Sequence, residues 1–244
     1  MTNTGLVKVD GQEIAQSTKD ILMRELKSGA QGIDFRPTIY KIDHKGFNFY
    51  SEADGSSKKT LQGVVILKQK VRGLWKEGEK MPLCSSLDGI SGLNRVDDLR
   101  HPCLTCPNNK WKSGKGGQGK ECKEMRRIMI VENTEDIFPV LLNIPPTSIK
   151  IFDAFVSALI SKKIALLMTN VKFSLEKAEA QGFKYAKIKM GIGEPLTEAQ
   201  ILKVDAVKQQ FAAQFNALDI QPEEEKVDDF CSKEYDPDNE ELPV

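Results

Sequence analysis

The sequence has few histidines and no recognisable catalytic motif. Its two histidines, His44 and His101, lie far apart, and neither belongs to a nucleophile or zinc-protease motif. The glycine-rich run at 114–120, GKGGQGK, follows no apolar strand and has no Ser or Thr after its last lysine, unlike a phosphate-binding loop. The carboxylates are spread, and they form no compact acidic motif of the kind that a two-metal nuclease uses. These absences favour a binding protein over an enzyme.

Long apolar runs are also missing. The longest candidates, such as IFPVLLNI at 137–144, are long enough for a strand but not for a membrane span. The first 14 residues, MTNTGLVKVDGQEI, are polar and lack the apolar core of a secretory signal. We therefore expect a cytoplasmic protein that does not associate with membranes and whose thiols stay reduced.

The net charge of zero hides an asymmetry between the body and the end of the chain. Residues 221–244 hold ten acidic residues and two lysines, a net charge of −8, so residues 1–220 carry +8. A basic body joined to an acidic tail is typical of a nucleic-acid-binding protein whose tail has another role.

Four of the five cysteines lie in residues 84–122, which we call the cysteine segment. Cys103 and Cys106 form a C-x-x-C pair, and Cys84 and Cys122 stand on either side of it. Four thiolates match one tetrahedral zinc ion and leave no open coordination position, so the spacing predicts one structural Zn²⁺. The alternatives are disulfides, which a reducing cytoplasm disfavours, an iron–sulfur cluster, and a site in which His101 replaces one thiolate.

Hydrophobic periodicity predicts a mainly β chain with helices, an α+β fold. Residues 1–34 are expected to form an N-terminal arm or short helix, 35–220 a single domain, and 221–244 a disordered acidic tail. Strands are expected at 36–43, 45–52, 60–75, 125–132, 136–145, 165–178 and 183–192, and helices at 145–163 and 194–220. This order fits a small antiparallel barrel of the oligonucleotide-binding (OB) kind, with 84–122 as a zinc-binding insertion. A sheet with helices on one side is the alternative.

Aromatic and basic residues are interleaved along the body. Single-stranded nucleic acid is held by this combination, because cations follow the phosphates while aromatic faces stack on bases. Phe47 and Phe49 could equally be core residues, whereas Trp111 has few apolar neighbours in the sequence. The candidate contacts are Tyr40, Phe47, Phe49, Lys68, Lys70, Arg72, Trp75, Lys110, Trp111, Lys112, Lys115 and Lys120.

Several stretches carry a resemblance to a known family. They are PLCSS, CLTCPNNKW and KECKEMRR around the cysteines, PPTSIKIFDAF at a helix start, and DDFCSKEYDPDNEELPV at the end. Together they resemble the single-stranded DNA-binding proteins encoded by bacteriophages and related mobile elements. The resemblance implies a non-enzymatic protein in a bacterial host cell, with an OB-type barrel that holds the strand and an acidic tail that recruits replication or recombination proteins.

The apolar candidates for such a tail contact are Phe230, Tyr235, Leu242, Pro243 and Val244. The end of the chain, Leu-Pro-Val, departs from the bacterial pattern of an apolar pair with phenylalanine. Two hypotheses result: a single-stranded DNA-binding protein with one structural zinc, and a zinc-ribbon regulator that binds a polymerase or a host-defence protein. A nuclease is a third and weaker one. The sequence leaves the oligomeric state open.

Overall fold

The computed structural model describes residues 6–9, 12–15, 21, 24–25, 28, 37–51, 53–79, 81–117, 119–136, 138–180 and 183–218. The chain divides into two compact units, Met1–Pro37 and Thr38–Val244. In the first, β1 (Leu6–Val9) pairs antiparallel with β2 (Gln12–Ala15), and residues 21, 24, 25 and 28 are helical, within the helix predicted there. The predicted acidic tail, 221–244, lies outside the described residues.

The second unit is built on a mixed sheet. Its main path runs β5-β4-β3-β11-β10-β6-β7-β8-β9, and the hairpin of β12 and β13 joins it through β6. Among the described strands, only β3 and β11 pair in parallel. The bounds are β3 (Ile39–Asp43), β4 (Asn48–Ser51), β5 (Ser57–Lys58), β6 (Thr60–Leu74), β7 (Cys84–Ser86), β8 (Ser91–Asn94), β9 (Leu99–Pro102), β10 (Lys123–Val131), β11 (Val140–Ile144), β12 (Thr169–Ala180) and β13 (Phe183–Pro195).

Strand β6 is the longest and connects the parts of this unit. Its start pairs with β12, most of its length pairs with β10, and its end pairs with β7 of the cysteine segment. The register with β10 shifts between Met129 and Ile130, so β6 carries one extra residue there. Residues 75–122 are therefore an insertion between β6 and β10, which pair with each other.

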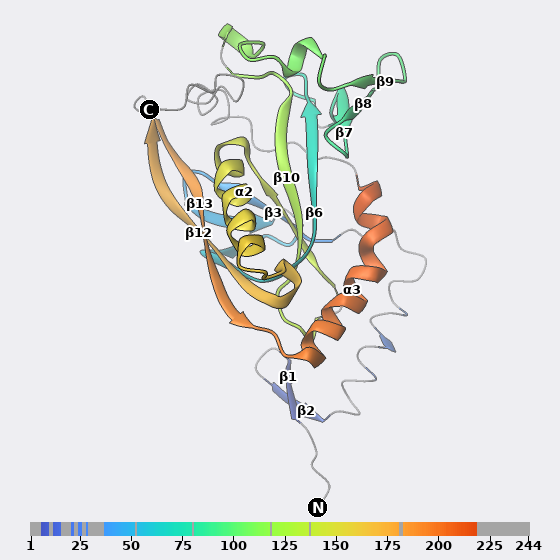
Figure 1. The fold of residues 1–244 in the computed structure, drawn as a ribbon, viewed down its shortest axis with the longest axis vertical. Coiled ribbons are helices and arrows are strands. Elements are labelled where there is room, and N and C mark those ends of the chain that lie inside the picture. The colour runs from blue at the N-terminus through green and yellow to red at the C-terminus, as the bar shows by residue number, and fades with distance from the viewer. Residues whose placement is uncertain are drawn as a thin grey trace, which may run out of the picture. The chain divides into compact units, whose positions relative to one another are not determined.

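Helices α2 (Pro146–Ser161) and α3 (Glu198–Ala217) cover opposite faces of the sheet. Ile128 belongs to the core cluster that contains Phe152 of α2, while its neighbour Arg127 donates a hydrogen bond to the carbonyl of Leu218, just after α3. Consecutive strand residues point to opposite faces, so the two helices lie on different sides. Figure 1 shows α2 between the β12–β13 hairpin and the β6–β10 pair.

Helix α2 begins one residue after the predicted start, whereas α3 begins four residues after it, because residues 194–195 still belong to β13. Pro145 stands at the N-cap of α2 and Pro146 at its first position, where a missing N–H costs nothing. Thr197 caps α3 and forms a capping box with Gln200. Three short 3-10 helices, η1 (Pro107–Asn109), η2 (Lys115–Gly117) and η3 (Leu166–Met168), complete the described structure.

The mainly β, α+β prediction is confirmed, but the sheet is not a closed barrel. Among the described residues, the main path ends at β5 on one side and at β9 on the other, without pairing between them. The parallel β3–β11 pair and the branch at β6 also differ from a simple antiparallel barrel. No helix in the described ranges is long and apolar enough to cross a membrane.

Candidate metal centre and nucleic-acid surface

The backbone of the cysteine segment brings its four cysteines to one end of β6. Cys84 begins β7 and pairs with Leu74 at the end of β6. The N–H of Cys103 donates to Ile90 O at 2.8 Å, and the N–H of Cys122 donates to Asn108 O at 2.9 Å. Cys106 closes a tight turn on Cys103, with its N–H 3.4 Å from the Cys103 carbonyl oxygen. Residues that are far apart in sequence are thereby gathered.

A glycine makes room for the sulfurs. A Cβ placed on Gly92 would lie 2.7 Å from Cys84 Sγ and 3.8 Å from Cys103 Sγ. Cys84, Cys106 and Cys122 line one cavity of about 370 Å³, which His101 also borders. Three of the four cysteines thus line one cavity, and a side chain on Gly92 would collide with the sulfur of Cys84.

The titration of the thiols reflects this crowding. Burial raises the pKa of Cys84, and the charges of Cys103, Cys106 and Asp97 raise it further. Burial also raises the pKa of Cys122 to about 12, although the positive charge of Arg72 acts in the opposite direction. Without a cation these buried thiols stay protonated at neutral pH, so metal binding has to displace their protons.

The thiols are close but are not arranged as a finished site. Cys84, Cys103, Cys106 and Cys122 are all free thiols. Within the described ranges, no three His, Cys, Asp or Glu side chains are positioned so that they could hold a metal ion. Coordination would require the sulfurs to move toward one point. The donor set nevertheless suits zinc, because soft thiolates are its preferred ligands in structural sites.

His101 has another partner. Its Nε2 lies 2.8 Å from Asp97 Oδ2, and both side chains are partly exposed. The backbone N–H of Leu99 and then this contact with His101 lower the pKa of Asp97. His101 therefore has Nε2 engaged with a carboxylate, an arrangement that metal-binding histidines usually show at the ring nitrogen that does not hold the metal, so its Nδ1 stays an alternative ligand to one of the thiolates.

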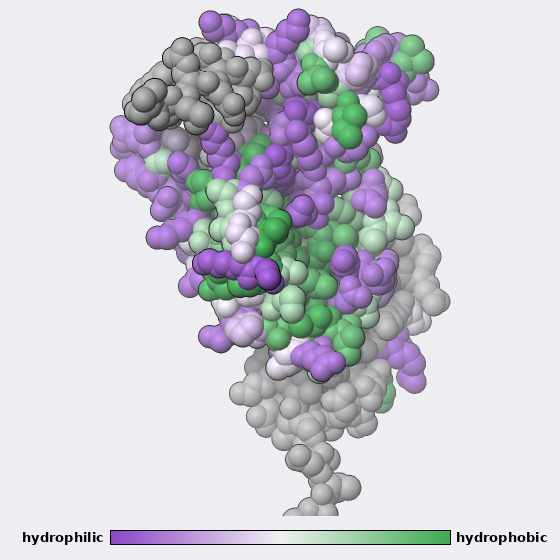
Figure 2. Space-filling model, in the orientation of Figure 1, coloured by the Kyte–Doolittle hydropathy of each residue, from purple (hydrophilic) through white to green (hydrophobic). Residues whose placement is uncertain are grey.

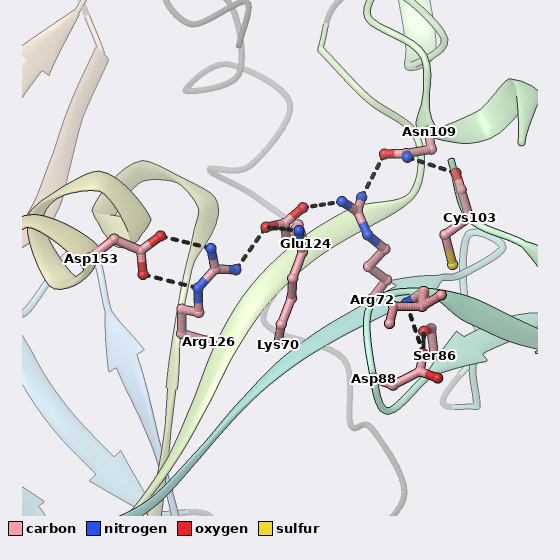
Figure 3. Close-up of polar contacts among 10 residues, drawn as sticks. Lys70, Arg72, Ser86, Asp88, Cys103, Asn109, Glu124, Arg126 and Asp153 are labelled. Carbon is pink, nitrogen blue, oxygen red and sulfur yellow. Dashed lines mark hydrogen bonds and ion pairs between the residues drawn. The ribbon is translucent and has the colours of Figure 1, made fainter. Parts of the chain in front are cut away.

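A polar network links the cysteine segment to the sheet and to α2 (Figure 3). Arg72 on β6 donates to Glu124 on β10 and, at 2.5 Å, to Asn109 Oδ1. Asn109 in turn donates to the carbonyl of Cys103 at 2.8 Å. On the other side of Glu124, Arg126 donates to Glu124 at 2.7 Å and to Asp153 of α2, also at 2.7 Å.

The predicted aromatic contacts differ in their burial. Tyr40 and Phe49 are 3% and 0% exposed and belong to the main core cluster, so in this conformation they present no face to a base. Phe47 is partly buried and packs against the same cluster. Trp75 packs against Val71 and Met125, with its ring directly over Gly73. Trp111 is half-buried in the loop that follows η1.

The predicted basic contact residues also differ in their exposure. Lys68, Lys70, Lys110, Lys112 and Lys115 are exposed, and Lys120 is half-buried. Lys70 forms an ion pair with Glu124 at 3.3 Å, and Lys115 one with Glu77 at 3.3 Å. Arg72, in contrast, is 7% exposed and its terminal nitrogens are engaged inside the protein, so it serves the internal network and is not available as a phosphate contact.

Sequence reasoning missed two features. One is the network through Asn109, Glu124 and Arg126, for which the charge-rich run KECKEMRR at 120–127 was the available signal. The other is a group of exposed apolar side chains on the cysteine segment: Ile90, Val96, Leu99 and Leu104, which are 59–89% exposed. Their irregular spacing is not distinguishable in sequence from that of core residues.

No protein-family model, no curated protein and no solved structure matches this chain. The geometry of the site therefore carries the functional argument.

Proposed function

We propose that this protein binds single-stranded DNA, catalyses no reaction, and carries one structural Zn²⁺ in its cysteine segment. Cys84, Cys103, Cys106 and Cys122 would hold the ion. The ion would cross-link loops that have no hydrophobic core of their own. A four-thiolate shell offers no position for substrate, which suits a structural and not a catalytic role.

The observation that carries the proposal is the side-by-side placement of exposed cations and the thiol cluster. β6 carries Lys68 and Lys70 toward the cysteine segment, whose loop adds Lys110 and Lys112 next to Trp111. Figure 2 shows hydrophilic residues gathered over the upper ends of β6 and β10, beside that segment. Cations that follow a backbone and an aromatic ring that can stack on a base are the requirements for holding a single strand.

The wider role follows from the resemblance. A function in the replication or recombination of phage or mobile-element DNA in a bacterial cytoplasm is consistent with a sequence-tolerant binder. The acidic residues 221–244 would then recruit a partner protein through Phe230, Tyr235 or the final Leu242, Pro243 and Val244.

Titration with labelled oligonucleotides tests the proposal. The full chain should bind a single strand more tightly than the matched duplex, with little dependence on base sequence. Native mass spectrometry of freshly prepared, reduced protein should show one zinc per chain. Equal affinity for both DNA forms would contradict the DNA-binding function, and metal-free protein would contradict the zinc assignment.

The exposed apolar side chains favour a second candidate, a regulator that binds a protein through the cysteine segment. Ile90 and Leu104 lie near each other, because the N–H of Cys103 bonds to Ile90 O. Exposed apolar side chains that lie next to one another often mark a protein interface, whereas single ones do not. A Leu104→Ser substitution separates the two functions: it should leave single-strand affinity unchanged if the protein is a DNA binder, and it should weaken partner capture if it is a regulator.

A further inference from the structure

Arg72 is a buried cation whose partners do not use all of its donors. Its side chain is 8% exposed, and burial of a guanidinium is unfavourable unless its N–H groups and its charge are compensated. One terminal nitrogen donates to Asn109 and the other to Glu124. Its Nε is buried and has no hydrogen-bond partner. The Nε–H of Arg72 is therefore a buried hydrogen-bond donor without an acceptor.

The charges around Arg72 do not balance. Lys70, Arg72 and Arg126 converge on Glu124, and Arg126 also pairs with Asp153. Three cations thus share two carboxylates. Lys70 is partly solvated, whereas Arg72 is not. An uncompensated charge inside a protein is costly, so further negative charge is expected nearby.

Arg72 lies beside the thiol cluster. Glu124, which pairs with Arg72 across β6 and β10, stands two residues after Cys122, itself 8% exposed, and Asn109 connects the Arg72 guanidinium to the carbonyl of Cys103. A divalent ion bound by four thiolates has a net charge of −2. A buried centre of that kind lacks a counter-charge, and the cysteine segment supplies no buried cation of its own among its described residues.

We propose that Arg72 is the buried counter-charge of the metal–tetrathiolate centre, supplied by the sheet and not by the cysteine segment, with its Nε–H available to a cysteine sulfur. This inference rests on the proposed zinc site. It makes Arg72 a positioning residue: its charge balances that of the four bound sulfurs and, through Asn109, it fixes the backbone of Cys103. Groups around a metal site that act through its ligands typically change metal affinity by about 10–100-fold.

Three variants of the full chain test it, with zinc affinity and release rate measured by competition with a chromophoric chelator. Arg72→Met keeps much of the volume and removes the charge, and it should weaken zinc binding about 10–100-fold. Arg72→Lys keeps the positive charge but lacks the Nε–H, so its zinc affinity should lie between those of the wild type and Arg72→Met. Glu124→Gln removes the competing carboxylate, so it should strengthen zinc binding or leave it unchanged.

Lys70→Met is the matched control, because Lys70 also pairs with Glu124 but is partly solvated. A second measurement uses cobalt in place of zinc. A positive donor near a thiolate raises the energy of sulfur-to-metal charge transfer, so Arg72→Met should move that absorption band to longer wavelength, while Lys70→Met should not.

The outcomes separate this inference from the zinc proposal. Wild-type protein without metal would overturn both. One zinc per wild-type chain, with Arg72→Met matching Lys70→Met in affinity and cobalt spectrum, would overturn the role of Arg72 alone. If Arg72→Met does not fold, Arg72→Lys and Glu124→Gln decide. Weakened zinc binding in Glu124→Gln would overturn the counter-charge role. Wild-type zinc affinity in Arg72→Lys would support that role and overturn only the contact of the Nε–H with a sulfur.

Discussion

Gly92 and Cys84 lie so close that a Cβ on Gly92 would stand 2.7 Å from the Cys84 sulfur. A Cβ atom essentially never lies this close to a non-bonded atom, so any side chain here must displace the sulfur or the strand. Gly92 is in β8 and Cys84 in β7, two short strands that pair antiparallel. The space for the thiol cluster therefore depends on the absence of one methyl group.

Gly92→Ala should accordingly reduce metal uptake. The added methyl group pushes Cys84 away from the other thiols, and a four-ligand site that loses one ligand binds zinc much more weakly. Zinc content after dialysis against a weak chelator measures the effect. Gly191→Ala is the control, because no atom lies within 4 Å of the Cβ position there. Equal zinc retention in the two variants would show that the thiols do not converge as we propose.

Lysine substitutions should change the salt dependence of DNA binding. For a single strand, the log–log slope is about −0.7 per phosphate neutralised, so four to six contacts predict roughly −3 to −4. Lys68→Gln, Lys110→Gln and Lys112→Gln should each reduce the slope by about 0.7. Lys45→Gln, at an exposed lysine in the β3–β4 turn, should leave it unchanged. A slope near zero in the wild type would argue against an electrostatic surface.

The two tryptophans should respond differently to DNA. Trp111 lies in the basic loop, so Trp111→Ala should weaken single-strand binding by about 1–3 kcal/mol if it stacks on a base. Trp75 packs over Gly73 against Val71, so Trp75→Ala should mainly lower stability, by roughly 2 kcal/mol, less than for a fully buried tryptophan.

Fluorescence of single-tryptophan variants distinguishes them. In Trp75→Phe only Trp111 emits, and an oligonucleotide should quench it. In Trp111→Phe only Trp75 emits, and the signal should stay nearly constant. Quenching of Trp75 alone would move the stacking surface from the cysteine segment to the end of β6.

The acid sensitivity of the cysteine segment should depend on Asp88. Its carboxylate accepts hydrogen bonds from the N–H groups of Ser91 and Ile90 and from the Ser86 hydroxyl. The backbone bonds, that from Ser91 first, lower the pKa of Asp88 to about 2. Because the folded-state pKa is below the unfolded one, the stabilisation is complete above about pH 4 and is lost as the pH falls toward 2.

Asp88→Asn should therefore be less stable than the wild type at pH 7, and the difference should shrink between pH 4 and pH 2. Urea unfolding at several pH values measures it. Asp98→Asn, at an exposed carboxylate of the β8–β9 turn, is the control. A stability difference that does not change with pH would mean that the charge of Asp88 is unimportant.

Individual strands and helices could be predicted where the hydrophobic pattern of a short segment determines them. The alternation at 60–75 predicts β6, and the Pro-Pro stop before an apolar stripe predicts α2. The open sheet was not predictable, because the parallel pairing of Leu141 with Ile39 joins residues about a hundred positions apart. Closure of a barrel depends on such pairings and not on periodicity.

The candidate site was predictable to the same extent. A C-x-x-C pair with two distant cysteines is a moderate local signal; the structure places three of the four around one cavity, and the zinc ion itself stays a prediction. Arg72 follows Lys68 and Lys70 in the alternation and is indistinguishable from them in sequence. It is buried because the register places Glu124 directly opposite, and that register is set by the whole length of the β6–β10 pair.

The acidic residues 221–244 should compete with DNA for the basic body. Their charge of −8 faces +8 in residues 1–220, and a tether keeps the local concentration of the tail near the body in about the millimolar range. Deletion of 221–244 should therefore tighten single-strand binding, most clearly at low salt, where screening is weakest. A variant with the ten acidic residues changed to Asn and Gln keeps the length and should behave like the deletion. If full-length and truncated proteins bind equally at low salt, the tail does not compete, and its charge serves solubility or partner recruitment instead.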